Sequence, residues 1–531
     1  MFNKAFWGSR LCIAGIWITI TTVHASEEQH FDLLELRVKG NSLLERRMIE
    51  RTVYPFLGKN KTIETVESAR SALEAIYHQQ GFQTVAVDIP EQDVEGGIVY
   101  LEVAEGKVSK LRVSDSRYFS LGKIKEKVPE LAEGKIPNVP IMQQQLAELA
   151  KESPDRQVTP ILRAGETPGT LEVDLKVKDE LPVHGKVEVN ARNVAGTSLL
   201  RTIGTISYDN LWQRFHSASL TYQVTPERPD EVEVLVGSYV MPVPAFFESN
   251  AKFAFYAVSS SSNSSIASAG ALSVIGNGDV YGARLIKPLP VHGNYSHSFT
   301  TGLDYKSFSE DLNLIGADTL KTPITYLPFT AQYNGNLLND NSTLSFNVGV
   351  DFSVRGLGND TQEFANKRFG AKADYIVLNA GLDYKYKLPG EMDLRWRLSG
   401  QVANSPIISN EQYSIGGSES VRGYFETQML SDDGVQTSLE WYSPRLIPSE
   451  GNWESINSFR GLVFLDAGRG WLQNALSGVD DQVNLASSGV GLRFQGWKYL
   501  TANLDIAVPF IDNGRINAGD PRVHFRVLTE F

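Results

Sequence analysis

Arg422 is a charged residue in a loop that has no obvious need for a charge. It lies in "SESVRGYFE" (residues 418–426), which separates two stretches of alternating apolar and polar residues. An arginine binds a carboxylate through two parallel hydrogen bonds, and such a pair would hold the loop in one orientation. The alternative interpretation is that Arg422 is a solvated charge on a surface loop.

Asp466 is the carboxylate that the sequence offers as a partner. In "LVFLDAG" (residues 462–468), Asp466 has the opposite parity to Val463 and Leu465. Successive side chains of a strand point to opposite faces, so the two apolar residues can face lipid while Asp466 points inward. Asp466 is therefore a candidate partner for Arg422.

The residues beside Arg422 support a tightly folded loop. The segment reads Val421, Arg422, Gly423, Tyr424. Gly423 permits a tight turn because it has no Cβ. Tyr424 is expected to brace the loop by packing.

Other chemistry finds little support in the sequence. There is no HExxH, GxSxG or GxxxxGK[ST] motif, and the eight histidines are scattered. We therefore disfavour an enzyme and expect no cofactor and no metal site. The net charge of −12 argues against nucleic acid as a partner.

Strands with a strict period of two dominate the chain after Pro182. Clear examples are residues 344–352, 378–388 and 392–398. A half-buried soluble sheet would show the same alternation. Length near ten residues, recurrence to the C-terminus and aromatic residues on the apolar face favour membrane strands. Lipid cannot satisfy an open sheet edge, so such strands must close into a barrel with a polar lumen.

The residues before Pro182 mix helices and strands. Two successive segments each follow the order strand, helix, helix, strand, strand, which suggests two copies of one small α/β module. The alternative is one soluble enzyme domain, which no catalytic motif supports. We place the modules at residues 26–106 and 107–181, and the barrel at residues 182–531.

The N-terminus has the features of a secretory signal peptide. Lys4 and Arg10 precede the apolar run 11–23, and small residues at "VHA" indicate cleavage after Ala25. An N-terminal membrane anchor is the alternative. The chain's one cysteine, Cys12, lies in this segment, so the mature chain is expected to contain no disulfide.

Several stretches resemble a known family. They are "LGKNKTIETVESARSALEAIYHQQGF" (57–82), "SPDRQVTPILRAGETPGTLEVDLKVKDELP" (153–182), "VRGY" (421–424) and "FLDAG" (464–468). Together they resemble the outer-membrane transporters of two-partner secretion, the TpsB family of haemolysin and adhesin exporters. The resemblance implies two periplasmic α/β POTRA domains followed by a membrane β-barrel of sixteen antiparallel strands.

The resemblance also implies roles for particular residues. The VRGY segment would lie at the tip of a long extracellular loop folded back into the pore. In the family, the arginine of this segment pairs with the aspartate of the second motif. In this sequence these two residues are Arg422 and Asp466, and the second motif also contains Phe464 and Gly468. The terminal Phe531, after an alternating strand, resembles the signal by which bacterial outer-membrane proteins are recognised for assembly. Many members begin with a helix that plugs the pore; here the first module begins near Phe31, so no plug helix is expected.

The function implied is export of one large, unfolded partner protein from periplasm to cell surface, with possible activation of that partner. The partner's N-terminal secretion domain would be captured by the POTRA domains through strand addition. Outer-membrane lipids and the barrel-assembly machinery are the other expected partners. The alternative is an outer-membrane protein insertase of the same superfamily, against which the second-POTRA match and the count of only two modules argue.

Overall fold

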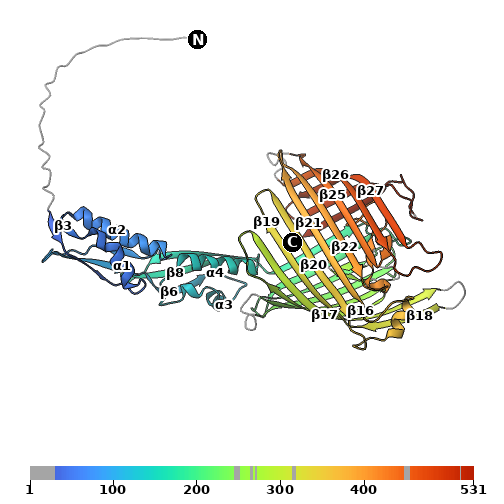
Figure 1. Cartoon of the computed structure of the whole chain (residues 1–531), viewed down its shortest axis with the longest axis horizontal. Helices are drawn as coiled ribbons and strands as arrows, with labels where there is room; N and C mark the ends of the chain where they lie inside the picture. The colour runs from blue at the N-terminus through green and yellow to red at the C-terminus, as the bar shows by residue number, and fades with distance from the viewer. Residues whose placement is uncertain are drawn as a thin grey trace, which may run out of the picture. The chain divides into compact units, whose positions relative to one another are not determined.

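The chain forms two compact units (Figure 1). The computed structural model describes residues 30–243, 251–262, 267–269, 272–274, 276–313, 319–447, 455–514 and 516–531. The expected signal peptide and residues 26–29, which bear on the plug helix, lie outside the described residues. None of the helices in the described ranges has the length and apolar character needed to cross a membrane.

The first α/β module has the predicted order of elements. Its sheet has the order β2-β5-β4, with β2 parallel to β5, and β1 pairs separately with β3. The long helix α2 buries Val66, Ala69, Leu73 and Tyr77, whose helical spacing places them on one core-facing side. The elements are β1 (Phe31–Leu33), β2 (Glu35–Lys39), α1 (Arg46–Val53), η1 (Tyr54–Phe56), β3 (Gly58–Lys61), α2 (Ile63–Gln79), β4 (Ala86–Asp88) and β5 (Ile98–Ala104).

The second α/β module repeats this order. Its sheet has the order β6-β8-β7, with β6 parallel to β8. The elements are β6 (Lys107–Ser114), α3 (Leu121–Glu126), η2 (Pro129–Leu131), α4 (Val139–Glu152), β7 (Arg156–Ala164) and β8 (Thr170–Asp179). Residues 117–123 and 152–156 belong to the barrel unit, although they precede residue 182 in the chain.

The remaining residues close into an antiparallel barrel, because β29 pairs with β9. The sheet contains seventeen strands among the described residues, but β18 and β19 both pair with β17 and act as one interrupted strand, giving sixteen. This confirms the predicted architecture. The strands are β9 (Val183–Asn190), β10 (Arg201–Leu211), β11 (His216–Val224), β12 (Val232–Pro242), β13 (Lys252–Ser262), β16 (Gly278–Pro288), β17 (Tyr295–Asn313), β18 (Thr319–Tyr326), β19 (Pro328–Leu338), β20 (Ser342–Ser353), β21 (Ile376–Leu388), β22 (Met392–Ala403), β25 (Asp433–Arg445), β26 (Ile456–Trp471), β27 (Gln482–Gly496), β28 (Leu500–Pro509) and β29 (Arg522–Glu530).

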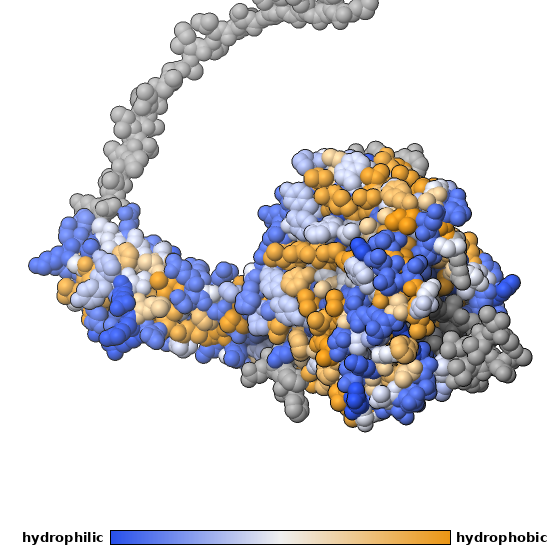
Figure 2. All heavy atoms as spheres, turned by 45° about the vertical axis from the view of Figure 1, so that its right-hand side comes forward, coloured by the Kyte–Doolittle hydropathy of each residue, from blue (hydrophilic) through white to orange (hydrophobic). Residues whose placement is uncertain are grey.

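The alternation predicted from the sequence separates the two faces of the barrel wall. On β26, Val463 and Leu465 are 46% and 53% exposed, whereas Phe464 and Asp466 are 5% and 0% exposed. Apolar residues gather over the outer surface of the barrel unit (Figure 2). Such a surface suits the hydrocarbon interior of a bilayer.

A long segment between β22 and β25, residues 404–432, folds against the inner wall of the barrel; we call it the pore loop. It contains η3 (Ser409–Glu411) and a two-stranded ribbon of β23 (Tyr413–Ile415) and β24 (Met429–Ser431). The helix α5 (Thr361–Lys367) lies in the connection between β20 and β21, and a separate ribbon pairs β14 (Ala267–Ala269) with β15 (Leu272–Val274).

Candidate functional site

Arg422 and Asp466 form a buried ion pair between the pore loop and β26. Arg422 Nε and Nη2 donate to the two carboxylate oxygens of Asp466 at 2.7 and 2.8 Å. The backbone N–H of Arg422 donates to the same carboxylate at 3.1 Å. Because the side chains are only 1% and 0% exposed, Arg422 is not a solvated loop charge.

Four further wall residues complete the surroundings of the Arg422 guanidinium. Its Nη1 lies 2.9 Å from Glu440 Oε1 and 3.8 Å from Asp505 Oδ2. Its Nη2 donates to Ser438 Oγ at 3.1 Å. The guanidinium carbon lies 3.5 Å from the ring centroid of Phe464. We call this set the wall pocket: Ser438, Glu440, Phe464, Asp466 and Asp505.

The charges of the wall pocket keep Arg422 protonated. Burial by itself lowers the pKa of the guanidinium. The hydrogen bonds and charge of Asp466, together with the charges of Glu440 and Asp505, outweigh burial and raise the pKa above its usual value. A permanently charged loop residue therefore faces fixed negative charge on the wall.

Glu440 and Asp505 were not identified from the sequence, although a signal was present. Glu440 lies between Leu439 and Trp441, and Asp505 lies between Leu504 and Ile506. Each carboxylate thus has the inward parity that identified Asp466. What the sequence could not show is that β25, β26 and β28 direct these groups to one point.

Gly468 provides the space in which the pore loop packs against β26. A Cβ at this position would lie 2.6 Å from Ile415 Cγ2 and 3.0 Å from Val421 Cγ2. Gly423 has a φ of +90°, a conformation that side chains other than glycine's rarely adopt. The two glycines of the motifs thus serve different purposes, close approach and chain reversal.

Tyr424 and Val421 fix the tip of the loop by packing. Both are fully buried and share a cluster with Ile415 and Leu485. The Tyr424 hydroxyl lies 3.1 Å from the carbonyl of Ala486 and 2.9 Å from that of Ile511. These contacts attach the loop tip to β27 and to the segment that follows β28.

The loop tip also contacts the barrel on both sides of its seam, where β29 meets β9. The Gly423 N–H donates to His524 Nε2 of β29 at 3.0 Å. Glu426 N–H donates to the carbonyl of Asn193, just after β9, at 3.1 Å, and the Glu426 carboxylate lies 3.6 Å from Arg192 Nε. The tip is therefore bound to wall segments far apart in the sequence.

Asp432 attaches the C-terminal end of the pore loop to other connections of the barrel. Its fully buried carboxylate is paired with both terminal nitrogens of Arg368, which follows α5. It also accepts from the backbone N–H groups of Ile407 at 3.1 Å and Gln473 at 2.8 Å. One carboxylate thus joins three connections of the barrel.

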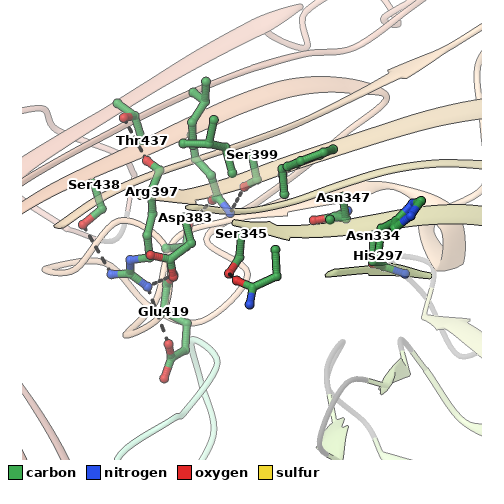
Figure 3. Close-up of a pocket in the computed structure, with 18 of the residues that line it drawn as sticks. His297, Asn334, Ser345, Asn347, Asp383, Arg397, Ser399, Glu419, Thr437 and Ser438 are labelled. Carbon is green, nitrogen blue, oxygen red and sulfur yellow. Dashed lines mark hydrogen bonds and ion pairs between the residues drawn. The ribbon is translucent and has the colours of Figure 1, made fainter. Parts of the chain in front are cut away.

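A cavity of about 590 Å³ lies beside the pore loop (Figure 3). Glu419 of the loop and Arg397 of β22 lie at its border, 3.7 Å apart. Strands β17, β19, β20, β21, β22 and β25 supply most of the remaining lining, which includes the polar residues Asn334, Asn347, Asp383, Ser399 and Ser438 and the apolar residues Phe346, Leu382 and Leu398. Unfilled space therefore remains next to the loop.

One group with metal-ligand chemistry occurs among the described residues: Asp155, His184 and Asp209. The His184 Nε2 lies 3.1 Å from Asp155 and 3.4 Å from Asp209. These contacts account for the grouping without an ion.

The terminal residue, Phe531, closes the backbone pairing of the seam. Its N–H and C=O exchange hydrogen bonds of 2.9 Å with Gly185, while its side chain is 66% exposed.

A lumen occupied by a fastened loop, inside a wall that is apolar outside, places the chain among outer-membrane β-barrel transporters. More specifically, the chain belongs to the family described as haemolysin secretion/activation protein ShlB/FhaC/HecB, whose model matches residues 169–494. Residues 31–106 match the POTRA domain, ShlB-type. These matches confirm the resemblance identified from the sequence and, with the fold, an outer-membrane location.

Individual relatives agree with this placement. The outer membrane transporter CdiB of Dickeya dadantii (strain 3937) is 24% identical over 434 residues, which cover 80% of this chain and 74% of that protein. The structure of CdiB from Escherichia coli has a TM-score of 0.62 at 17% identity, covering 98% of this chain and 94% of that one. BamA from Haemophilus ducreyi lacking POTRA domains 1–3 has a TM-score of 0.59 at 16% identity, covering 94% and 100%. At these identities the structures show a shared fold.

Proposed function

We propose that the chain exports one large secreted protein through its lumen, and that the pore loop is the closure of that lumen. The observation that carries this proposal is the bidentate Arg422–Asp466 pair, which is buried inside the barrel, with a cavity beside the pore loop. A loop that only decorated the cell surface would have no need of a buried ionic attachment, whose desolvation is costly.

The α/β modules would capture the exported protein in the periplasm. The second module repeats the element order of the first, which supports its identification as a second POTRA domain. Edge strands β2 and β4 in the first sheet, and β6 and β7 in the second, offer backbone groups to an extended chain. The partner's N-terminal secretion domain would bind there by strand addition.

Assembly of the transporter would use the exposed terminal Phe531 as a recognition signal for the barrel-assembly machinery. Lipid would then surround the apolar outer wall. Entry into the periplasm would require the expected signal peptide at residues 1–25.

The alternative function is insertion of other outer-membrane proteins, since the fold is shared with BamA. The family match favours export. The test is to express the chain with the large secreted protein encoded beside its gene, and to measure that protein in the medium and the levels of other barrel proteins in the membrane. Export predicts that deleting the chain removes the secreted protein alone. Loss of unrelated barrel proteins would support the insertase.

A further inference from the structure

The wall pocket around Arg422 is built entirely by the barrel, and the loop contributes only the group that fills it. Its residues come from β25 (Ser438 and Glu440), β26 (Phe464 and Asp466) and β28 (Asp505). Gly489 of β27 makes room for the Phe464 ring, because a Cβ there would lie 2.4 Å from Phe464 Cζ. The pocket would therefore persist if the loop withdrew.

The geometry of the pocket suits a guanidinium more than any other cation. A guanidinium has five N–H donors in a plane. Here five oxygens face them: both of Asp466 at 2.7 and 2.8 Å, Ser438 at 3.1 Å, Glu440 at 2.9 Å and Asp505 at 3.8 Å. The Phe464 ring offers its face to the guanidinium, whose carbon lies 3.5 Å from the ring centroid. An ammonium or a sodium ion lacks the planar pair of N–H donors that makes two parallel hydrogen bonds to Asp466.

Withdrawal of Arg422 would leave one carboxylate of the wall pocket without a cation. Glu440 also pairs with Arg397 at 3.1 Å and Arg395 at 3.9 Å, and Asp505 pairs with Arg493 at 2.7 Å. Among the described residues, the only ion pair of Asp466 is with Arg422, at 2.7 Å. A buried carboxylate without a partner is costly, which favours entry of another cation beside Asp466.

We propose that the wall pocket is a guanidinium-binding site that accepts arginine side chains of the exported chain when the pore loop withdraws. This rests on the proposed export through the lumen. An arginine of the passing chain would replace Arg422 on the same five oxygens and the same ring, so the buried carboxylates would stay neutralised during transport.

The first experiment tests the pocket without any exported protein. Purified Arg422→Ala protein is heated in detergent with millimolar N-ethylguanidinium, and separately with ethylammonium at equal ionic strength. We expect N-ethylguanidinium to raise the unfolding temperature of the variant by a few degrees in a saturable manner, and ethylammonium to have no effect. Arg422→Ala/Asp466→Ala, which lacks the fork, should not respond. Equal responses to the two cations, or none, would overturn the proposal; Arg422→Gln provides the same test if the alanine variant does not assemble.

The second experiment tests the arginine ligand. Extended Gly-Ser peptides carrying one arginine or one lysine are added to the Arg422→Ala protein, and channel block is measured in planar bilayers. At least a tenfold tighter block by the arginine peptide is expected. Equal block by both peptides would overturn recognition of arginine, whereas a failure of export itself would appear separately as loss of the secreted protein from the medium.

Discussion

Arg422 and Asp466 are predicted to matter for attachment of the loop rather than for formation of the barrel. Arg422→Ala and Asp466→Ala each leave an unbalanced charge in a buried site, a loss of about 3–5 kcal/mol when a buried pair is broken. We expect each variant to lower secretion at least tenfold while folded barrel is still recovered from the membrane. The measurement is the amount of secreted partner per folded transporter.

The double variant separates charge balance from attachment. Arg422→Ala/Asp466→Ala removes one charge of each sign, so its thermal stability should exceed that expected from adding the two single losses. Secretion should nevertheless stay low because the loop remains unfastened. Arg355→Ala is the control: its pair with Asp374 is 2.9 Å long but solvent-exposed, and secretion should not change. Normal secretion by both single variants would contradict the fastening role.

Gly468 allows a second prediction at the scale of single residues. Gly468→Ala places a Cβ against Ile415 and Val421, and overpacking of this kind costs about 1–3 kcal/mol. We expect the loop to be displaced and channel conductance to rise in planar bilayers. Gly237→Ala on β12 is the matched control, because no heavy atom lies within 4 Å of its added Cβ. A change of equal size in both variants would indicate a general effect on the barrel.

At the scale of elements, the alternating pattern predicts strands and the direction of their side chains, because lipid and lumen impose opposite polarity on neighbouring residues. That pattern was sufficient to place Asp466 inward and to place the loop between β22 and β25. It could not place His524 or Asn193 beside the loop tip, since these contacts depend on how a long irregular segment lies across a closed wall. Nor does any local pattern mark Asp432 as the junction of three connections.

The β23–β24 ribbon permits a precise removal of the loop tip. Because Ile415 pairs with Met429, residues 416–428 can be replaced by a two-residue Asn-Gly hairpin turn. The contacts of Asp432, which hold the C-terminal end of the pore loop, would remain. We expect conductance to rise sharply and secretion to stop, since the group that fills the wall pocket is gone.

The same measurement tests the expectation that no plug helix closes the pore. Deleting residues 26–30 should leave conductance unchanged if the pore loop is the closure. An open channel after this short deletion, together with an unchanged channel after replacement of residues 416–428, would show that the N-terminal segment closes the lumen instead.

At the scale of the whole molecule, the boundary between modules and barrel is not one point in the sequence. The Arg156 guanidinium carbon lies 4.9 Å from the ring centroids of both Phe119 and Phe215, and all three residues belong to the barrel unit. Gln213 Nε2 donates to the carbonyl of Tyr118 at 3.0 Å. Segments 117–123 and 152–156 therefore contribute to the stability of the barrel, although a reading by sequence alone assigns them to the second module.

Two truncations should accordingly behave differently. Deleting residues 31–105 removes only the first module, so binding of the partner's secretion domain should be lost while the unfolding temperature of the barrel stays the same. Deleting residues 31–178 also removes Phe119 and Arg156, and the barrel should then unfold at a lower temperature. Arg156→Ala in the full chain should reproduce part of this decrease, because it removes the cation that contacts both rings. The unfolding temperatures of the three proteins are measured by the heat-dependent loss of folded barrel on gels. Equal values for the two truncations would show that these segments add nothing to the barrel, and retained binding by the shorter deletion would place partner capture elsewhere.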